Sequence, residues 1–121
     1  MSTVAEKAAA LAEIARIEGR IRECRQSKKS VDKVRKKLID KRDELNDIHE
    51  DLNEKKVEKT DIFEGNMAES LECRVKKLED MIDLNINLAE AVGDKLKQQS
   101  NNIDTAIAKL EGEKRKQQAI L

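Results

Sequence analysis

The chain has 121 residues, of which 41% are charged and 38% are hydrophobic, and it contains no Pro, no Trp and no Tyr. That balance is typical of long helices or a coiled coil rather than of a globule with a thick core. The 25 basic residues are cancelled by 25 acidic ones, which removes the charge excess that nucleic acid or anionic lipid would attract. We therefore expect one helical domain over residues 1–121, without a nucleic-acid partner or membrane insertion.

The N-terminal segment does not resemble a signal peptide, because charged residues flank its short apolar run from Ala8 to Ala12. No window of the sequence has the uninterrupted apolar length of a membrane-spanning helix. We expect a cytoplasmic protein.

Apolar residues recur at every seventh position of the first half, which predicts a helix over about residues 3–59. A companion row begins with Ile14 and Ile21 but then becomes basic, so the apolar stripe is narrow. The apolar row comprises Ile17, Cys24, Val31, Leu38, Leu45 and Leu52. The companion row continues with Lys28, Arg35, Arg42 and His49.

The stretch KTDIFEGNMAESL, residues 59–71, contains the only cluster of turn-forming residues between the two halves. Gly65 supplies the backbone freedom that a tight reversal needs. Asn66 with Glu69 has the spacing of a helix N-cap and capping box, and Asp61 with Glu64 is a competing box one turn earlier. We predict a bend over about residues 60–66.

The same seven-residue period predicts a second helix over about residues 66–117. Asn85 and Gln99 interrupt its companion row, either as buried polar groups that select the register or as exposed breaks. The apolar row comprises Val75, Ile82, Ala89, Leu96, Ile103 and Leu110. The expected companions are Leu71, Leu78, Val92 and Ala106.

The two rows fit an antiparallel hairpin. Pairing Ile17 with Leu110 also pairs Cys24 with Ile103 and every later step of seven. The midpoint of this pairing lies between Phe63 and Glu64, inside the predicted bend. The predicted fold is therefore all-α, a long, coiled-coil-like antiparallel hairpin of two helices.

No group of residues converges as a catalytic or metal site would. His49 is the only histidine, and we expect it on the charged surface of the first helix. Cys24 and Cys73 lie at apolar positions, where a thiol packs as a small hydrophobic group. We predict that the chain is not an enzyme and has no cofactor.

Two helices alone cannot cover every apolar residue of this sequence. Apolar surface outside the two rows is usually covered by another helix, either of a second copy or of a different protein. The residues thus predict function by helix-on-helix binding. The candidate partner surface comprises Ile39, Val57, Met81, Leu84, Ile86 and Leu88.

The bend carries a family resemblance. Phe63 and Gly65 stand where the WXG family of bacterial type VII secretion has Trp and Gly, and the predicted hairpin resembles that family's fold. Phe63, Gly65, Ala68 and Leu71 together resemble the bend of a branch encoded beside LXG toxins. The first-helix segment LAEIARIEGRIRECRQSKKSV also resembles that branch.

This resemblance implies a non-enzymatic targeting factor, or chaperone, that binds the helical LXG domain of a toxin and helps deliver it to a type VII secretion system. A second small helical helper is an implied partner. The aromatic tail motif of the WXG family is absent, so export with the cargo would rely on the helper's signal. Two alternatives stay open: a secreted WXG-type hairpin that forms its own dimer, and a coiled-coil scaffold whose arms open into long dimeric helices.

Overall fold

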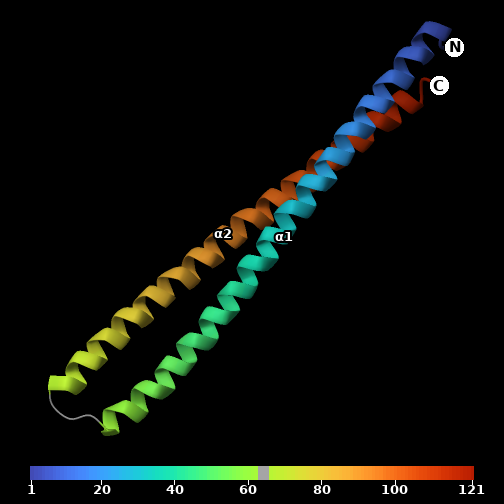
Figure 1. Ribbon diagram of the computed structural model, residues 1–121. Helices are drawn as coiled ribbons and strands as arrows, with labels where there is room; N and C mark the ends of the chain where they lie inside the picture. Colours follow the sequence, from blue (N-terminus) through green and yellow to red (C-terminus); the bar gives the residue numbers. More distant parts are fainter. Residues whose placement is uncertain (63–65) are drawn as a thin grey trace. The chain divides into compact units, whose positions relative to one another are not determined.

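The computed structural model is all-α, with two long helices packed as an antiparallel hairpin (Figure 1). Helix α1 spans Val4–Ile62 and helix α2 spans Asn66–Gln118. The structure describes the backbone of residues 1–62 and 66–121, and the side chains of residues 1–54 and 69–121. The predicted fold class is confirmed.

A side chain caps the start of α1. The Thr3 hydroxyl accepts a hydrogen bond of 3.1 Å from the backbone N–H of Glu6, and the Thr3 carbonyl accepts one of 3.0 Å from the N–H of Lys7. At the other end of the chain, the last turn of α2 carries Arg115 and Lys116, whose charges favour a helix C-terminus. The start of α1 and the end of α2 thus carry residues that favour a helix terminus.

The chain forms two compact units, and each contains a segment of α1 beside a segment of α2 (Figure 1). The terminal unit comprises Met1–Val34 and Leu96–Leu121, and it contains both ends of the chain. The bend unit comprises Arg35–Lys95.

Most of the fully buried apolar side chains lie in the terminal unit. Ile17 is the most buried of them, with 1% of its surface exposed. In the bend unit, Ile82 is the one buried hydrophobic residue among the described side chains. The buried hydrophobic residues of the terminal unit are Ala10, Ile14, Ile17 and Ile21.

Both predicted apolar rows lie on less exposed faces of their helices. Ile17 and Ile82 are buried, and the other ten residues are half-buried. A thin two-helix contact explains why few are fully covered, since each row has only one neighbouring helix. The half-buried residues are Cys24, Val31, Leu38, Leu45, Leu52, Val75, Ala89, Leu96, Ile103 and Leu110.

The predicted companion row of α2 is wrong at Leu78, Val92 and Ala106, which are exposed, whereas Leu71 is half-buried. Leu78 and Val92 are 45% and 44% exposed, and Asn85 and Gln99 are exposed breaks rather than buried polar groups. The buried or half-buried companion row lies on the other side of Ile82 and includes the small residues Gly93 and Ser100. It comprises Glu79, Ile86, Gly93, Ser100, Ile107 and Lys114.

Candidate interaction surface

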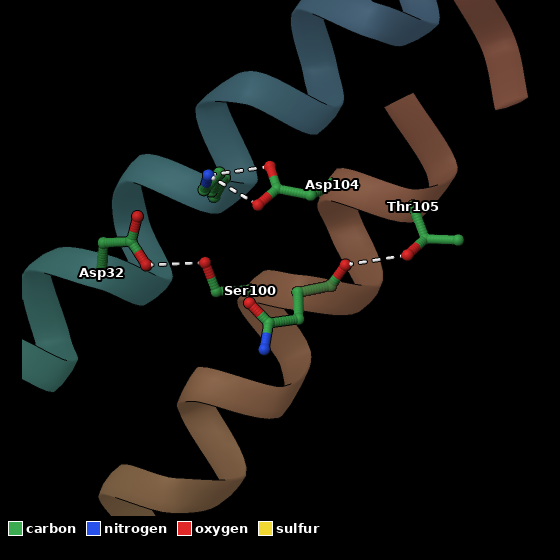
Figure 2. A network of polar contacts seen from close by, with 6 residues as sticks. Asp32, Ser100, Asp104 and Thr105 are labelled. Atoms are coloured by element: carbon green, nitrogen blue, oxygen red, sulfur yellow. Dashed lines mark hydrogen bonds and ion pairs between the residues drawn. The ribbon is translucent and has the colours of Figure 1, made fainter. Parts of the chain in front are cut away.

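Polar contacts join the two helices of the terminal unit. The Lys28 Nζ donates hydrogen bonds of 2.7 and 2.8 Å to the two carboxylate oxygens of Asp104. One turn away, the Ser100 hydroxyl donates a bond of 2.8 Å to Asp32 across the helix pair (Figure 2). Ser100 is only 7% exposed, so its hydroxyl needs this acceptor.

Two further ion pairs link the same segments. Arg25 lies 3.3 Å from Glu111, and Lys114 lies 3.1 Å from Glu18. The side chains of these ion pairs are partly exposed, and each such pair stabilises a fold by only about 0–1 kcal/mol. Their arrangement instead selects one register, because a shift of α2 along α1 would separate all of them at once.

The polar contacts between the helices lie further along α2 than the residues that the predicted pairing places opposite. That pairing places Gln99 opposite Lys28, whereas Lys28 contacts Asp104, further along α2. In an antiparallel coiled coil, the residues of one row insert between those of the facing row. The seven-residue period does not specify which polar residues meet across the helices.

The ion pair between Lys28 and Asp104 has an electrostatic consequence. The hydrogen bond from the Lys28 ammonium to the Asp104 carboxylate raises the pKa of Lys28 above its ordinary value, and the nearby charge of Asp32 acts in the same direction. A raised lysine pKa means that the folded state binds this proton more tightly than the unfolded state. The contribution to stability is complete below the ordinary lysine pKa and is lost as the pH rises through the folded value.

Basic side chains occupy the helix contact of the bend unit. The His49 Nε2 lies 3.2 Å from the Asp83 carboxylate, and the His49 side chain is 27% exposed. The prediction of a surface position for His49 is therefore wrong, since the basic companion row of α1 faces α2. Arg42 bonds its neighbour Asp43 at 3.1 Å.

Polar atoms are less well satisfied in this contact. Among the described residues, the Arg35 Nε and the Glu79 Oε1 are buried without a hydrogen-bond partner. A cavity of about 190 Å³ lies between the helices here. Its lining is Arg35, Ile39, Arg42, Ala89, Glu90, Gly93 and Asp94. The helix contact of the bend unit is thus partly polar, and two of its buried polar atoms lack partners.

Apolar side chains cover one exposed stripe of α2 in the bend unit, which we name the α2 apolar face. Met81 and Leu84 are 61% and 60% exposed, and Leu88 is 53% exposed. Residues three, four and seven apart lie on one side of a helix, so these side chains form a continuous stripe. The α2 apolar face comprises Leu78, Met81, Leu84, Leu88 and Val92.

The structure divides the residues of the predicted partner surface. Met81, Leu84 and Leu88 lie together on the α2 apolar face. Ile86 belongs to the companion row instead, where it is half-buried, and Ile39 lines the polar cavity. The side chain of Val57 lies outside the described residues. The sequence analysis did not include Leu78 and Val92 in the partner surface. Their spacing from the apolar row also fits a position between the two helices, where they were predicted.

The residues of the WXG-like bend are only partly described. Phe63 and Gly65 lie outside the described residues, and so does the side chain of Ala68. Leu71 is half-buried in α2. Of the two cysteines, Cys24 is half-buried as predicted, but Cys73 is exposed, so the prediction of an apolar packing position for Cys73 is wrong.

The described residues contain no cluster of three or more His, Cys, Asp and Glu side chains with the arrangement of a metal site. Neither helix, over the part of the chain that was described, has a segment long and apolar enough to cross a membrane. Comparisons of the chain with protein-family models, curated proteins and solved structures gave no match. The α2 apolar face, with its five exposed apolar side chains, is the candidate functional site, and its chemistry is that of helix packing.

Proposed function

We propose that this chain is a non-enzymatic targeting factor, or chaperone, that binds the helical LXG domain of a toxin and helps deliver it to a type VII secretion system. The observation that carries the proposal is the α2 apolar face, where five large apolar side chains are between 44% and 61% exposed. The resemblance of Phe63, Gly65, Ala68 and Leu71 to the bend of LXG-associated proteins supplies the biological context.

The proposed mechanism is lateral helix packing. A toxin helix lies along the bend unit and covers Met81, Leu84 and Leu88, completing a bundle with α1 and α2. Covering the exposed part of each side chain stabilises the complex by about 1 kcal/mol. Five such residues contribute about 5 kcal/mol, which only matches the lower estimates of the cost of association, so specific binding also needs contacts outside the α2 apolar face.

Co-expression with an LXG toxin tests the proposal. The chain is produced with the N-terminal helical region of a toxin encoded beside its gene, together with the second small helper. We expect the chain and the toxin region to elute as one complex in size-exclusion chromatography. Separate elution of the two, with the helper present, would contradict the proposal.

The alternative of a secreted homodimer uses the same observation, since a second copy is also able to cover the α2 apolar face. It predicts a dimer in the absence of any toxin. The alternative of an open scaffold has less support, because it requires the Lys28–Asp104 and Ser100–Asp32 contacts to separate. Sedimentation measurements on the isolated chain distinguish a monomeric hairpin from both.

A further inference from the structure

A groove lies between the two helices of the terminal unit, and residues of both helices line it. Its volume is about 560 Å³. Of the apolar side chains in its lining, Ala106 is exposed and the other three are half-buried. The hairpin alone therefore leaves these side chains partly in water. They are Cys24, Ile103, Ala106 and Leu110, and the uncharged polar residues of the lining are Ser27 and Gln99.

Each helix also places one basic and one acidic side chain in this lining. The two are three or four residues apart, so they lie on one side of their helix, one turn apart. None of the four has an ion-pair partner among the side chains of residues 1–54 and 69–121, which include the whole terminal unit. Of the charges near them, Glu13 and Arg16 bond each other. The four residues are Arg20 and Glu23 of α1, and Lys109 and Glu113 of α2.

The ion pairs of the terminal unit show which positions of the two helices are level. Lys114 contacts Glu18 at 3.1 Å, and Lys28 contacts Asp104 at 2.7 Å. Position 23 of α1 and position 109 of α2 are each midway between these contacts, so they lie at the same level. By the same spacing, position 20 is level with positions 112 and 113. Opposite charges are therefore level across the groove: Glu23 with Lys109, and Arg20 with Glu113.

We propose that a second copy of this chain occupies the groove, so that two hairpins lie side by side in the same direction. A two-fold axis parallel to the helices places α1 of each copy against α2 of the other. Arg20 then faces the second copy's Glu113, and Glu23 faces the second copy's Lys109. The apolar lining of one copy covers that of the other. This contact uses the terminal unit alone and goes beyond the proposed function.

Both charge and apolar burial favour this occupant. A partner with charges of one sign would be repelled by two of the four charges, whereas a second copy supplies alternating charges at the matching spacing. A copy in the opposite direction would also match charges, because Arg20 would face Glu23. That arrangement places Ile103 and Ala106 level with the last turn of the second copy's α2, which carries Arg115 and Lys116. Burial of the apolar lining therefore selects the same direction.

Sedimentation velocity of the full chain, at concentrations up to about 1 mM, measures the dimer. Ala106→Glu places a charge in the apolar lining and should weaken the dimer at least about tenfold. The matched control, Ala108→Glu, places the same charge at an exposed position of α2 outside the lining. This control should dimerise like the unmodified chain, and circular dichroism checks that both variants keep their helical content.

A mixture of two charge variants identifies the residues that meet. K109E and E23K should each dimerise weakly, because each places like charges across the two-fold axis. When the two are mixed, Glu23 of the K109E chain faces Lys109 of the E23K chain, and the two introduced charges also attract. We expect the mixed dimer to be at least about tenfold tighter than either variant's own dimer at low salt. The gain should shrink at high salt.

Three results would overturn the inference: a monomer over the whole concentration range, a dimer that Ala106→Glu leaves intact, or no gain on mixing K109E with E23K. A dimer that Leu84→Glu dissociates and Ala106→Glu does not would place the second copy on the α2 apolar face, as the secreted homodimer requires. Failure of the proposed function is a separate result. In that case the dimer behaves as expected, but no LXG toxin region co-elutes with the chain.

Discussion

The two units of this hairpin share the same seven-residue period, but they place different kinds of residue in the contact between the helices. In the terminal unit, the companion row of α1 starts with the buried Ile14 and Ile21, and polar contacts such as Ser100–Asp32 fix the register. In the bend unit, the same row carries Arg35, Arg42 and His49, and much of the apolar surface of α2 faces away from α1.

This difference separates the part that holds the hairpin together from the part that is available to a partner. Burial of aliphatic side chains is the main source of stability, and Ile17 has the most complete burial. Met81 and Leu84 contribute little to the isolated chain because they stay in water. Changes in the terminal unit should therefore affect folding, and changes on the α2 apolar face should affect binding.

The largest expected effect is on stability. Ile17→Ala removes buried methyl and methylene groups and should lower the free energy of unfolding by about 2–5 kcal/mol. Met81→Ala, on the exposed face, should change it by no more than about 0.5 kcal/mol. Urea denaturation followed by circular dichroism measures both. Equal losses for the two variants would erase the distinction between the units.

The buried hydrogen bond of the terminal unit gives a smaller effect. Ser100→Ala removes the donor to Asp32 and should lower the free energy of unfolding by about 1 kcal/mol. Thr105→Ala is the matched control, since the Thr105 hydroxyl bonds the Asn101 carbonyl within α2 and is exposed. A loss no larger for Ser100→Ala than for Thr105→Ala would show that the register does not depend on this contact.

In the bend unit, a substitution of Gly93 should raise the stability of the fold. No heavy atom lies within 4 Å of a Cβ built on Gly93, so Ala fits without displacement. Gly93→Ala should raise the free energy of unfolding by about 0.5–1 kcal/mol, because Ala has the higher helix propensity. Thermal unfolding provides the measurement. Destabilisation instead would mean that α1 approaches Gly93 more closely than the open space beside it indicates.

The smallest effect is the dependence of stability on alkaline pH. Asp104 raises the pKa of Lys28, so their pair stabilises the fold at neutral pH and stops doing so as Lys28 deprotonates. The difference in unfolding free energy between the unmodified chain and Lys28→Met should therefore shrink from about pH 8 to about pH 12. A constant difference over this range would imply that Lys28 acts through its aliphatic stem alone.

The fold was predictable because a strict seven-residue period has few structural solutions. The two apolar rows, from Ile17 and from Val75, were sufficient to predict an all-α hairpin. The side of α2 that completes the contact was not predictable by counting apolar residues. Leu78 and Val92 look more suitable for a core than Gly93 and Ser100, yet the latter lie between the helices.

The residues of the candidate site were predictable in part from the seven-residue period. Met81, Leu84 and Leu88 lie outside the apolar rows, and that alone marked them as surface. Ile39 and Ile86 also lie outside the apolar rows, but both are half-buried. Ile86 belongs to the companion row of α2, and Ile39 lines the cavity that Arg35 also lines. Polar contacts such as Lys28–Asp104 are present in the observed register of the two helices, and the apolar period does not specify them.

A pair of single substitutions tests the central claim most directly. Leu84→Glu places a charge on the α2 apolar face, whereas Asn87→Glu places the same charge at an exposed position three residues away. Both variants should fold like the unmodified chain, and their affinities for the helical region of the toxin are then compared by titration. The account predicts at least about tenfold weaker binding for Leu84→Glu and little change for Asn87→Glu. Equal affinities for the two variants would contradict it.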